Sequence, residues 1–320
     1  MRDLHILPKL RDSCSYLYVE HCRIDQEQKA VAIHDAEGKV PVPCASLALL
    51  MLGPGTSITH SAIRTLAEHG CSVVWCGEGG VRMYAQGMGE TRRAANLIRQ
   101  ARLCSVPKLR LQVVVRLYSM RFAEKLPEGF TLQQIRGREG VRVREAYASA
   151  SRATRVPWSG RNYRRDVWDG SDPVNRALSA ANSCLYGVCH AAVVSAGYSP
   201  GLGFIHTGKQ LSFVYDIADL YKVDLTIPVA FQAVASCPDD LPGIERIVRL
   251  TCRDTFNKAR LLARVVDDID RALGISDQAE AADEDDYDCD AALPGGIWDL
   301  EEGMVVGGHN DAPGPCDEAE

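Results

Sequence analysis

The sequence predicts an α+β protein, with a small β-rich domain that contains one helix, followed by a larger all-α domain. In residues 1–88, short apolar runs rich in β-branched and aromatic residues alternate with Gly- and Pro-containing turns. In residues 89–275, apolar residues instead recur at helical spacing. Residues 276–320 are acidic and contain several Pro and Gly, which indicates a disordered tail. A chain of 320 residues is long enough for these two domains.

The β-rich domain should consist of short strands around a single helix. Strands are expected at residues 15–22, 30–33, 39–42, 47–52, 72–75 and 81–85, and the helix at residues 59–69. Gly77–Gly80 reads GEGG and predicts the turn of a hairpin between the last two strands. It lacks the G-x-G-x-x-G pattern of a dinucleotide-binding loop.

The all-α domain should begin with basic, amphipathic helices. Helices are expected at residues 92–104, 108–125, 132–152, 172–196, 211–222 and 227–236, with one or two more in residues 244–273. Asp172 and Pro173 are typical of a helix start, as a cap and a first-turn proline. Residues 155–169 are irregular and basic, and we predict that Arg161 and Arg164 bind DNA phosphates there. A solvated loop is the alternative.

Charge is divided unevenly between the folded part and the tail. The formal net charge is −6, but residues 276–320 hold fifteen acidic residues and no Lys or Arg. Residues 1–275 therefore hold 36 basic and 27 acidic residues, a net charge of +9. A basic body favours a polyanionic partner such as nucleic acid. The tail also contains an apolar island around Ile297 and Trp298, which is typical of a segment that docks on a partner.

Targeting segments, disulfides and a zinc site are not expected. The longest strongly apolar run, residues 45–52, is too short to span a bilayer, and the N-terminus lacks the apolar core of a signal peptide. We therefore expect a cytoplasmic protein without a membrane partner. The twelve Cys residues are scattered, often within apolar runs, and no C-x-x-C occurs, which indicates reduced thiols in the core.

Residues 201–222, reading GLGFIHTGKQLSFVYDIADLYK, hold the strongest candidates for chemistry. His206 lies in a glycine-flanked loop, and Asp216 and Asp219 share a face of the following apolar helix because they are three residues apart. Carboxylates in apolar surroundings usually need a partner cation, although a solvated face or a helix-dipole partner is the alternative. The string GFIHTGK also resembles a phosphate-binding P-loop. However, Gln210 replaces its Ser or Thr and no parallel strand is expected before it, so nucleotide binding is not favoured.

Glu139 is a further candidate, located in an arginine-rich helix. It lies between Arg138 and Arg142, so a local salt bridge is the alternative interpretation. With His206 and one or both aspartates it gives a mixed oxygen and nitrogen donor set that suits Mg²⁺ or Mn²⁺. Such an ion polarises a phosphoryl oxygen and activates an attacking hydroxyl, while nearby Arg and Lys hold phosphates. These residues favour phosphodiester chemistry, but their spacing alone does not identify a site.

The chain also contains the strings QIRGREG followed by RVR, SCLYG, GYSPGLGFIHTGK and LSFVYDIADLYK. Together they resemble the CRISPR-associated integrase family of spacer acquisition, most closely its type I-E branch, over roughly residues 5–273. The resemblance implies a β-rich dimerisation domain and an all-α catalytic domain that binds metal and DNA. It implies that Glu139, His206 and Asp219 are catalytic metal ligands, and that Asp216 is a further acid beside them.

The same resemblance implies DNA contacts and partners. Tyr163, Trp168, Lys209 and Lys222 would line the DNA strand near the metal. Two homodimers would flank a dimer of the second CRISPR adaptation protein and carry a short protospacer duplex with 3′ overhangs. Each 3′-OH would then attack an end of the CRISPR repeat by metal-assisted transesterification. His21 lies near the position where the family carries a tyrosine that stacks on the duplex end.

Two other functions remain open on the sequence alone. A structure-specific DNA repair nuclease would use the same metal site with another substrate and partner. A non-catalytic DNA-binding scaffold would keep Glu139 and Asp219 for structural reasons only. Metal-dependent strand transfer that is lost in Glu139→Ala would exclude the scaffold, and neighbouring repeats with a second adaptation gene would separate the integrase from the nuclease.

Overall fold

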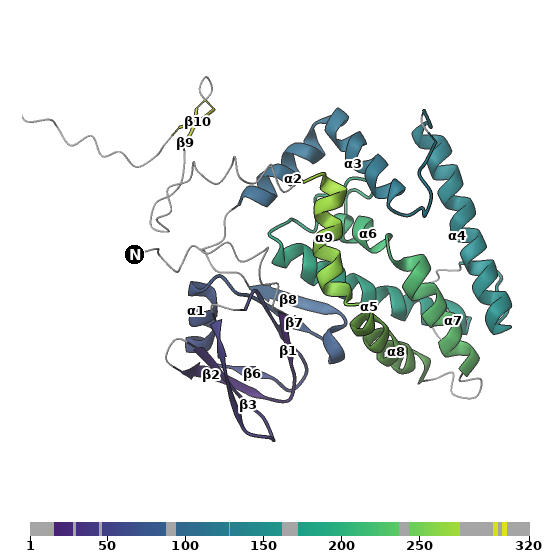
Figure 1. The fold of residues 1–320 in the computed structure, drawn as a ribbon. Helices are drawn as coiled ribbons and strands as arrows, with labels where there is room; N and C mark the ends of the chain where they lie inside the picture. The colour runs from purple at the N-terminus through teal and green to yellow at the C-terminus, as the bar shows by residue number, and fades with distance from the viewer. Residues whose placement is uncertain are drawn as a thin grey trace, which may run out of the picture. The chain divides into compact units, whose positions relative to one another are not determined.

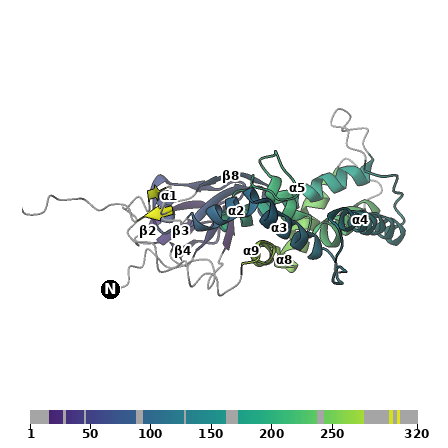
Figure 2. The same ribbon diagram turned by 90° about the horizontal axis from the view of Figure 1, so that it is seen from above.

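The computed structural model describes residues 16–27, 30–44, 47–87, 94–127, 129–161, 172–236, 243–275, 297–299 and 303–305. The described residues up to Ile275 belong to one compact unit, Pro8–Ile275, and those of the tail belong to a second. Within the first unit, the strands and one short helix come first in the chain and the remaining helices follow, and Figures 1 and 2 show these two sets of elements gathered in separate parts. This confirms the predicted α+β fold.

The strands of the first unit are β1 (Tyr16–Val19), β2 (Arg23–Glu27), β3 (Ala30–His34), β4 (Lys39–Pro43), β5 (Leu49–Leu52), β6 (Ser57–Ile58), β7 (Ser72–Cys76) and β8 (Met83–Gly87). Its helices are α1 (His60–Glu68), α2 (Ala95–Ser105), α3 (Pro107–Ser119), α4 (Leu132–Thr154), α5 (Pro173–Ser195), α6 (Ser212–Ala218), α7 (Ile227–Ser236), α8 (Ile244–Lys258) and α9 (Leu261–Leu273), with a 3₁₀ turn at Glu78–Gly80 and a π-helical turn at Lys222–Thr226.

Two four-stranded sheets and α1 build the β-rich part. One sheet has the order β1-β5-β7-β8, with the first three strands parallel and β8 antiparallel. The other has the order β4-β3-β2-β6, antiparallel except for the β2–β6 pair. Ile24, Leu50 and Leu66 belong to one fully buried apolar cluster that joins these sheets to α1. The antiparallel β7–β8 pair confirms that GEGG is a hairpin turn.

Strands β2 and β6 were not expected from the sequence. Strand β2 reads RIDQE and buries only Ile24 fully, while β6 is two residues long, so neither shows an apolar alternation. Both form because β2 pairs with β3 on one side and with β6 on the other. Backbone pairing rather than side-chain pattern decides these strands.

Helix α5 lies at the centre of the helical core. It contacts α6, α7, α8 and α9, and most of its residues are buried. By length and composition it could cross a membrane, but 72% of its most apolar stretch is buried inside the protein, as in a core helix. Ala191 and Val194 of α5 also pack against Leu49 and Met51 of β5, which joins the helices to the first sheet.

One predicted helix is interrupted in the structure, and a longer stretch forms two helices, as the sequence allowed. The acid-bearing helix expected at residues 211–222 ends as α6 at Ala218, and the chain resumes as a π-helical turn that leads into α7. Residues 244–273 form α8 and α9, which are separated at Arg260, where φ is 47°. Asp219 and Lys222 therefore lie at an irregular junction instead of inside a regular helix, a setting that is common at functional sites.

The tail contains one short hairpin among its described residues. Strands β9 (Ile297–Asp299) and β10 (Gly303–Val305) pair antiparallel, with Trp298 opposite Met304. The hairpin coincides with the apolar island, and it differs from the disorder expected for the whole tail. The acidic run before it lies outside the described residues.

Candidate metal centre

Asp216 on α6 holds the loop that carries His206. Its side chain is fully buried and accepts hydrogen bonds from the backbone N–H groups of Phe204 (2.6 Å), Ile205 (3.0 Å) and His206 (2.9 Å). Three converging backbone donors satisfy this carboxylate within the protein. Asp216 therefore positions the loop that carries His206, and its place among the catalytic residues stays a prediction.

The loop itself is too tight for a side chain at Gly203. A Cβ atom there would lie 2.3 Å from the carbonyl oxygen of His206. The loop follows α5 and a turn, not a strand, so the structural context of a P-loop is absent from this part of the chain.

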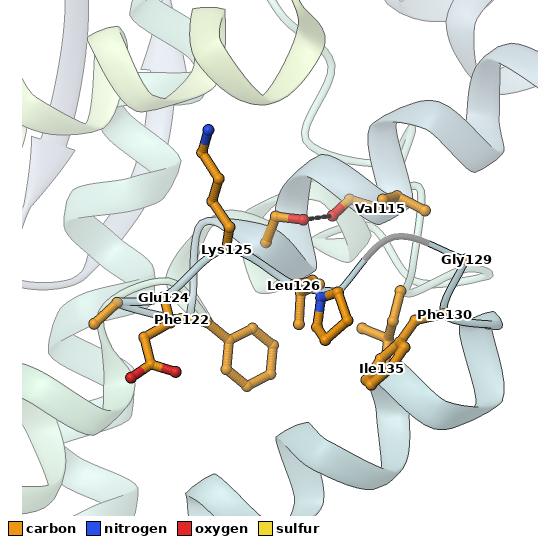
Figure 3. A pocket seen from close by; sticks show the side chains of 11 residues that line it. Val115, Phe122, Glu124, Lys125, Leu126, Gly129, Phe130 and Ile135 are labelled. Atoms are coloured by element: carbon orange, nitrogen blue, oxygen red, sulfur yellow. Dashed lines mark hydrogen bonds between the residues drawn. The ribbon is translucent and has the colours of Figure 1, made fainter.

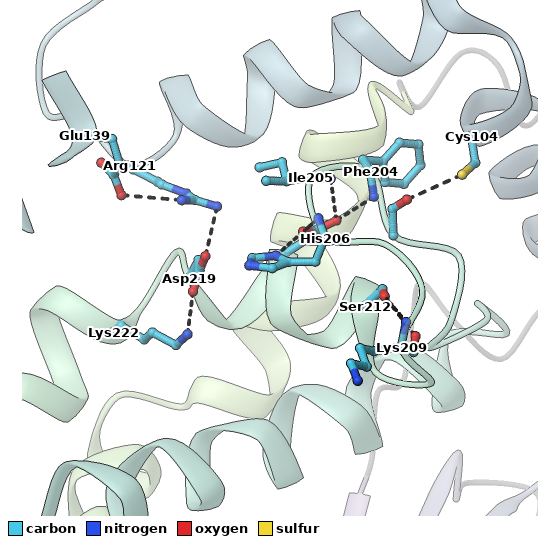
Figure 4. A network of polar contacts seen from close by, with 12 residues as sticks. Cys104, Arg121, Glu139, Phe204, Ile205, His206, Lys209, Ser212, Asp219 and Lys222 are labelled. Carbon is cyan, nitrogen blue, oxygen red and sulfur yellow. Dashed lines mark hydrogen bonds and ion pairs between the residues drawn. The ribbon is translucent and has the colours of Figure 1, made fainter. Parts of the chain in front are cut away.

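The imidazole of His206 is fixed by Asp216 at one nitrogen. Its Nδ1 donates to Oδ1 of Asp216 at 2.7 Å, which leaves Nε2 as the nitrogen that can bind a ligand. The hydrogen bond to Asp216 raises the pKa of His206, burial acts in the opposite direction, and Asp219 adds a further raising effect. The ring packs edge-on against Tyr215, with centroids 5.9 Å apart, and projects toward Asp219 (Figure 4).

Glu139 is presented by α4 and bound by two arginines. Helix α4 begins with a capping box between Thr131 and Gln134. Arg142, one turn after Glu139, donates two hydrogen bonds to it, from Nε to Oε2 at 2.8 Å and from Nη2 to Oε1 at 3.0 Å. Arg121, just beyond α3, approaches Oε1 with Nη1 at 3.4 Å. The local salt bridge that the sequence left open is therefore present, and it raises the pKa of Arg142.

Asp219 lies at the C-terminal end of α6 and also contacts two cations. Nζ of Lys222 is 2.6 Å from its Oδ1, and Nη2 of Arg121 is 3.5 Å from its Oδ2. Burial disfavours the charged form of Lys222, but Asp219 and Tyr186 outweigh this effect and raise its pKa. Arg121 thus connects the carboxylates of Asp219 and Glu139, as Figure 4 shows.

The donor atoms fit a hard divalent cation, although they are not gathered around one point. Within the described ranges, no three His, Cys, Asp or Glu side chains lie close enough together to hold a metal ion as they stand. However, a single guanidinium reaches both Glu139 and Asp219, so one cation between them is compatible with their positions. Two carboxylates and Nε2 of His206 are donors that suit Mg²⁺ or Mn²⁺. Nε and Nη2 of Arg121 are buried without a hydrogen-bond partner. The guanidinium between Glu139 and Asp219 therefore leaves part of its hydrogen-bonding capacity unused.

The residues predicted to bind DNA have different environments. Lys209 is exposed, and its backbone is fixed by the hydroxyl of Ser212. Lys222 is paired with Asp219, as described above. Arg161 donates from Nη1 to Asn175 (3.1 Å to the carbonyl oxygen) and from Nη2 to Ser179 (3.2 Å) on α5, so it anchors its segment to that helix.

The other predicted DNA contacts are Tyr163, Arg164 and Trp168, which lie outside the described residues. His21 is exposed and has a left-handed backbone with φ of 50°.

An open pocket lies apart from these residues, between the end of α3 and the start of α4. Its volume is about 450 Å³, and its lining is mainly apolar, including Val115, Phe122, Leu126, Phe130 and Ile135 (Figure 3). None of the predicted site residues lines it.

Sequence reasoning missed the role of Arg121 and did not assign one to Arg142. Arg142 lies three residues after Glu139 on one helix, so helical spacing alone gives a signal for their contact. Arg121 is eighteen residues from Glu139 and reaches it only because α3 and α4 pack together. No local pattern in the sequence indicates that pairing.

Comparison with known proteins gives a consistent result. A family model described as "CRISPR associated protein Cas1" matches residues 15–123 and 116–237. The chain is 55% identical to "CRISPR-associated endonuclease Cas1 2" of Thermus thermophilus, over 96% of this chain and 93% of that protein. It is 40% identical to "CRISPR-associated endonuclease Cas1" of Escherichia coli, over 91% and 95% respectively. Among solved structures, a TtCas1–DNA complex is 56% identical, covers 84% of this chain and 100% of its own, and superposes with a TM-score of 0.78.

Proposed function

We propose, since this chain belongs to the family of CRISPR-associated protein Cas1, that it is a metal-dependent DNA integrase and endonuclease of spacer acquisition. It joins the 3′-OH ends of a short protospacer duplex to the CRISPR repeat by transesterification. The observation that supports this best is the placement of Glu139, Asp219 and His206 beside fixed basic side chains. Oxygen ligands for a divalent cation next to positive charges for phosphates suit phosphodiester chemistry.

Each residue has a distinct part in the proposed reaction. Mg²⁺ or Mn²⁺, held by Glu139, Asp219 and Nε2 of His206, would polarise the phosphoryl oxygen and favour ionisation of the attacking hydroxyl. Asp216 keeps the proton of His206 on Nδ1, so that Nε2 presents a lone pair. Arg142 and Lys222 orient the two carboxylates, and their positive charge also attracts backbone phosphates.

The proposed substrates and partners follow from the same family membership. The substrates are a protospacer duplex with 3′ overhangs and the CRISPR repeat, and the existence of a DNA complex of TtCas1 supports DNA binding. Lys209, Lys222, Tyr163, Arg164 and Trp168 are proposed to contact the DNA. The protein is proposed to act in the cytoplasm, with two homodimers flanking a dimer of the second adaptation protein.

The test is integration of a labelled duplex with 3′ overhangs into a plasmid that carries the repeat, with and without the second adaptation protein. We expect joining that requires Mg²⁺ or Mn²⁺ and that falls by about a hundredfold or more in Glu139→Ala, His206→Ala and Asp219→Ala. Arg138→Ala, on the exposed side of α4, is the matched control and should remain active.

Each alternative predicts a different result in this assay. Metal-dependent cleavage without joining would instead support the repair nuclease. DNA binding without any reaction would support the scaffold. Joining that persists in EDTA would refute the metal-dependent mechanism.

A further inference from the structure

Arg121 is a buried cation whose hydrogen-bonding capacity is poorly used. Its side chain is only 4% exposed, and its guanidinium lies over the ring of Tyr118, 4.8 Å from the centroid. It reaches Glu139 and Asp219 at 3.4 and 3.5 Å, whereas ionised donors and acceptors usually meet at about 2.7–2.9 Å. Two of its nitrogens have no hydrogen-bond partner. A guanidinium in this state is held mainly by the charge around it.

The two carboxylates do not depend on Arg121 for a partner. Glu139 already receives two short hydrogen bonds from Arg142, and Asp219 is paired with Lys222 at 2.6 Å. Three cations therefore contact these two carboxylates in a largely buried space, and Asp224 adds one further negative charge near Arg142. Adding a divalent ion there increases the positive charge further, and like charges in a low-dielectric region repel strongly. Arg121 is the cation that is bound least tightly and the one that spans the gap.

We propose that Arg121 is a tethered counter-cation, which fills the gap between Glu139 and Asp219 in the metal-free protein and must be displaced when a divalent ion binds. This inference rests on the proposed metal site. Its consequence is that Arg121 weakens metal binding while DNA is absent. Phosphates of bound DNA supply the missing negative charge and a new partner for the guanidinium, so DNA and metal each strengthen the binding of the other.

The competing explanation is that Arg121 is a clamp that holds the carboxylates ready for the metal. A clamp needs short, well-aligned bonds, as Arg142 makes to Glu139, and the long contacts of Arg121 do not have this geometry. The two explanations predict opposite effects of removing the guanidinium. The counter-cation predicts tighter metal binding, and the clamp predicts weaker binding.

The experiment measures Mn²⁺ binding to the full chain by electron paramagnetic resonance of the free ion, first without and then with a DNA duplex. We expect Arg121→Gln to bind Mn²⁺ about tenfold more tightly than wild type without DNA, because one repelling charge is removed. DNA should reduce this difference by tightening binding to the wild type. Arg138→Gln is the matched control, since Arg138 is 41% exposed and pairs with Glu124 on the surface, and it should bind like wild type.

Unchanged or weaker Mn²⁺ binding in folded Arg121→Gln overturns the inference. Absence of saturable Mn²⁺ binding in the wild type, with and without DNA, instead refutes the proposed metal site. Should Arg121→Gln fail to fold, the side-chain Nε–H resonance of Arg121 in wild type is followed by nuclear magnetic resonance during a Mg²⁺ titration, with Arg121→Lys for assignment. Faster exchange of this proton with water on adding Mg²⁺ supports displacement, and unchanged exchange overturns it.

Discussion

Asp216→Asn replaces one oxygen of a buried hub with an amide nitrogen. Each carboxylate oxygen accepts two hydrogen bonds, Oδ2 from the N–H groups of Phe204 and Ile205, and Oδ1 from the backbone and Nδ1 of His206. The least costly arrangement places the amide nitrogen of Asn where Oδ1 of Asp216 was. The imidazole of His206 can then change tautomer, so that its Nδ1 accepts a hydrogen bond from this amide nitrogen. The backbone N–H of His206 is left without its acceptor, and the imidazole proton moves to Nε2.

Two effects should follow from this rearrangement. A lost hydrogen bond to a charged group costs about 1.5–3 kcal/mol, and weakening of the remaining bonds by loss of the charge adds to it. We therefore expect a free energy of unfolding about 3 kcal/mol lower, which for a chain of this size lowers the melting temperature by about 6 °C. Because Nε2 then carries the proton, metal binding and integration should be lost even in folded protein.

The assay is thermal and urea unfolding of wild type, Asp216→Asn and Asp254→Asn without metal. Asp254 is the control, because it is 67% exposed and its pairing with Arg253 is a surface contact worth at most about 1 kcal/mol. The reasoning is refuted if Asp216→Asn unfolds within error of wild type, or if it loses no more stability than the control.

Three further outcomes are expected. Gly187→Ala should lower the free energy of unfolding, because the new Cβ would lie 2.4 Å from the backbone nitrogen of Arg82. This clash should outweigh the preference of about 1 kcal/mol that alanine has over glycine in a helix. A variant more stable than wild type in urea unfolding would show that the backbone between α5 and β8 can move to accommodate the methyl group. Arg161→Ala should lower the free energy of unfolding by about 1 kcal/mol, because its hydrogen bonds to α5 are lost. It should leave the slope of log DNA affinity against log salt concentration unchanged, whereas Arg164→Ala should reduce that slope by about one. Equal slopes for the two variants would contradict these assignments. Because Asp216 raises the pKa of His206 above its usual value of 6.5, protonated His206 stabilises the fold fully below that value, and this contribution is lost as pH rises through the raised pKa. The stability difference between wild type and His206→Gln should therefore shrink as the pH rises above about 6.5, and a difference that does not depend on pH would show that the ion pair with Asp216 does not form.

Much of the fold was predictable because its signals are local. Asp172 with Pro173 starts α5, as their positions in the sequence indicated, and α1 lies within the range expected from its helical spacing. The GEGG turn and the apolar runs likewise located the β7–β8 hairpin and the buried strand β5. Strand β2 escaped prediction because its pairing partners, and not its own side chains, define it.

By itself, the sequence determined the α+β class and the helix starts, since these depend on residue type and short-range spacing, while the candidate residues Glu139, His206 and Asp219 came from the family motifs that the chain resembles. Only the tertiary structure decided that Asp216, inside α6, is buried as the loop anchor, while Asp219, just after α6, faces the cations. It also brought Arg121 between Glu139 and Asp219. Such pairings depend on the packing of α3, α4 and α6, and electrostatic energy depends on distance and burial in space, neither of which is encoded at any single position of the chain.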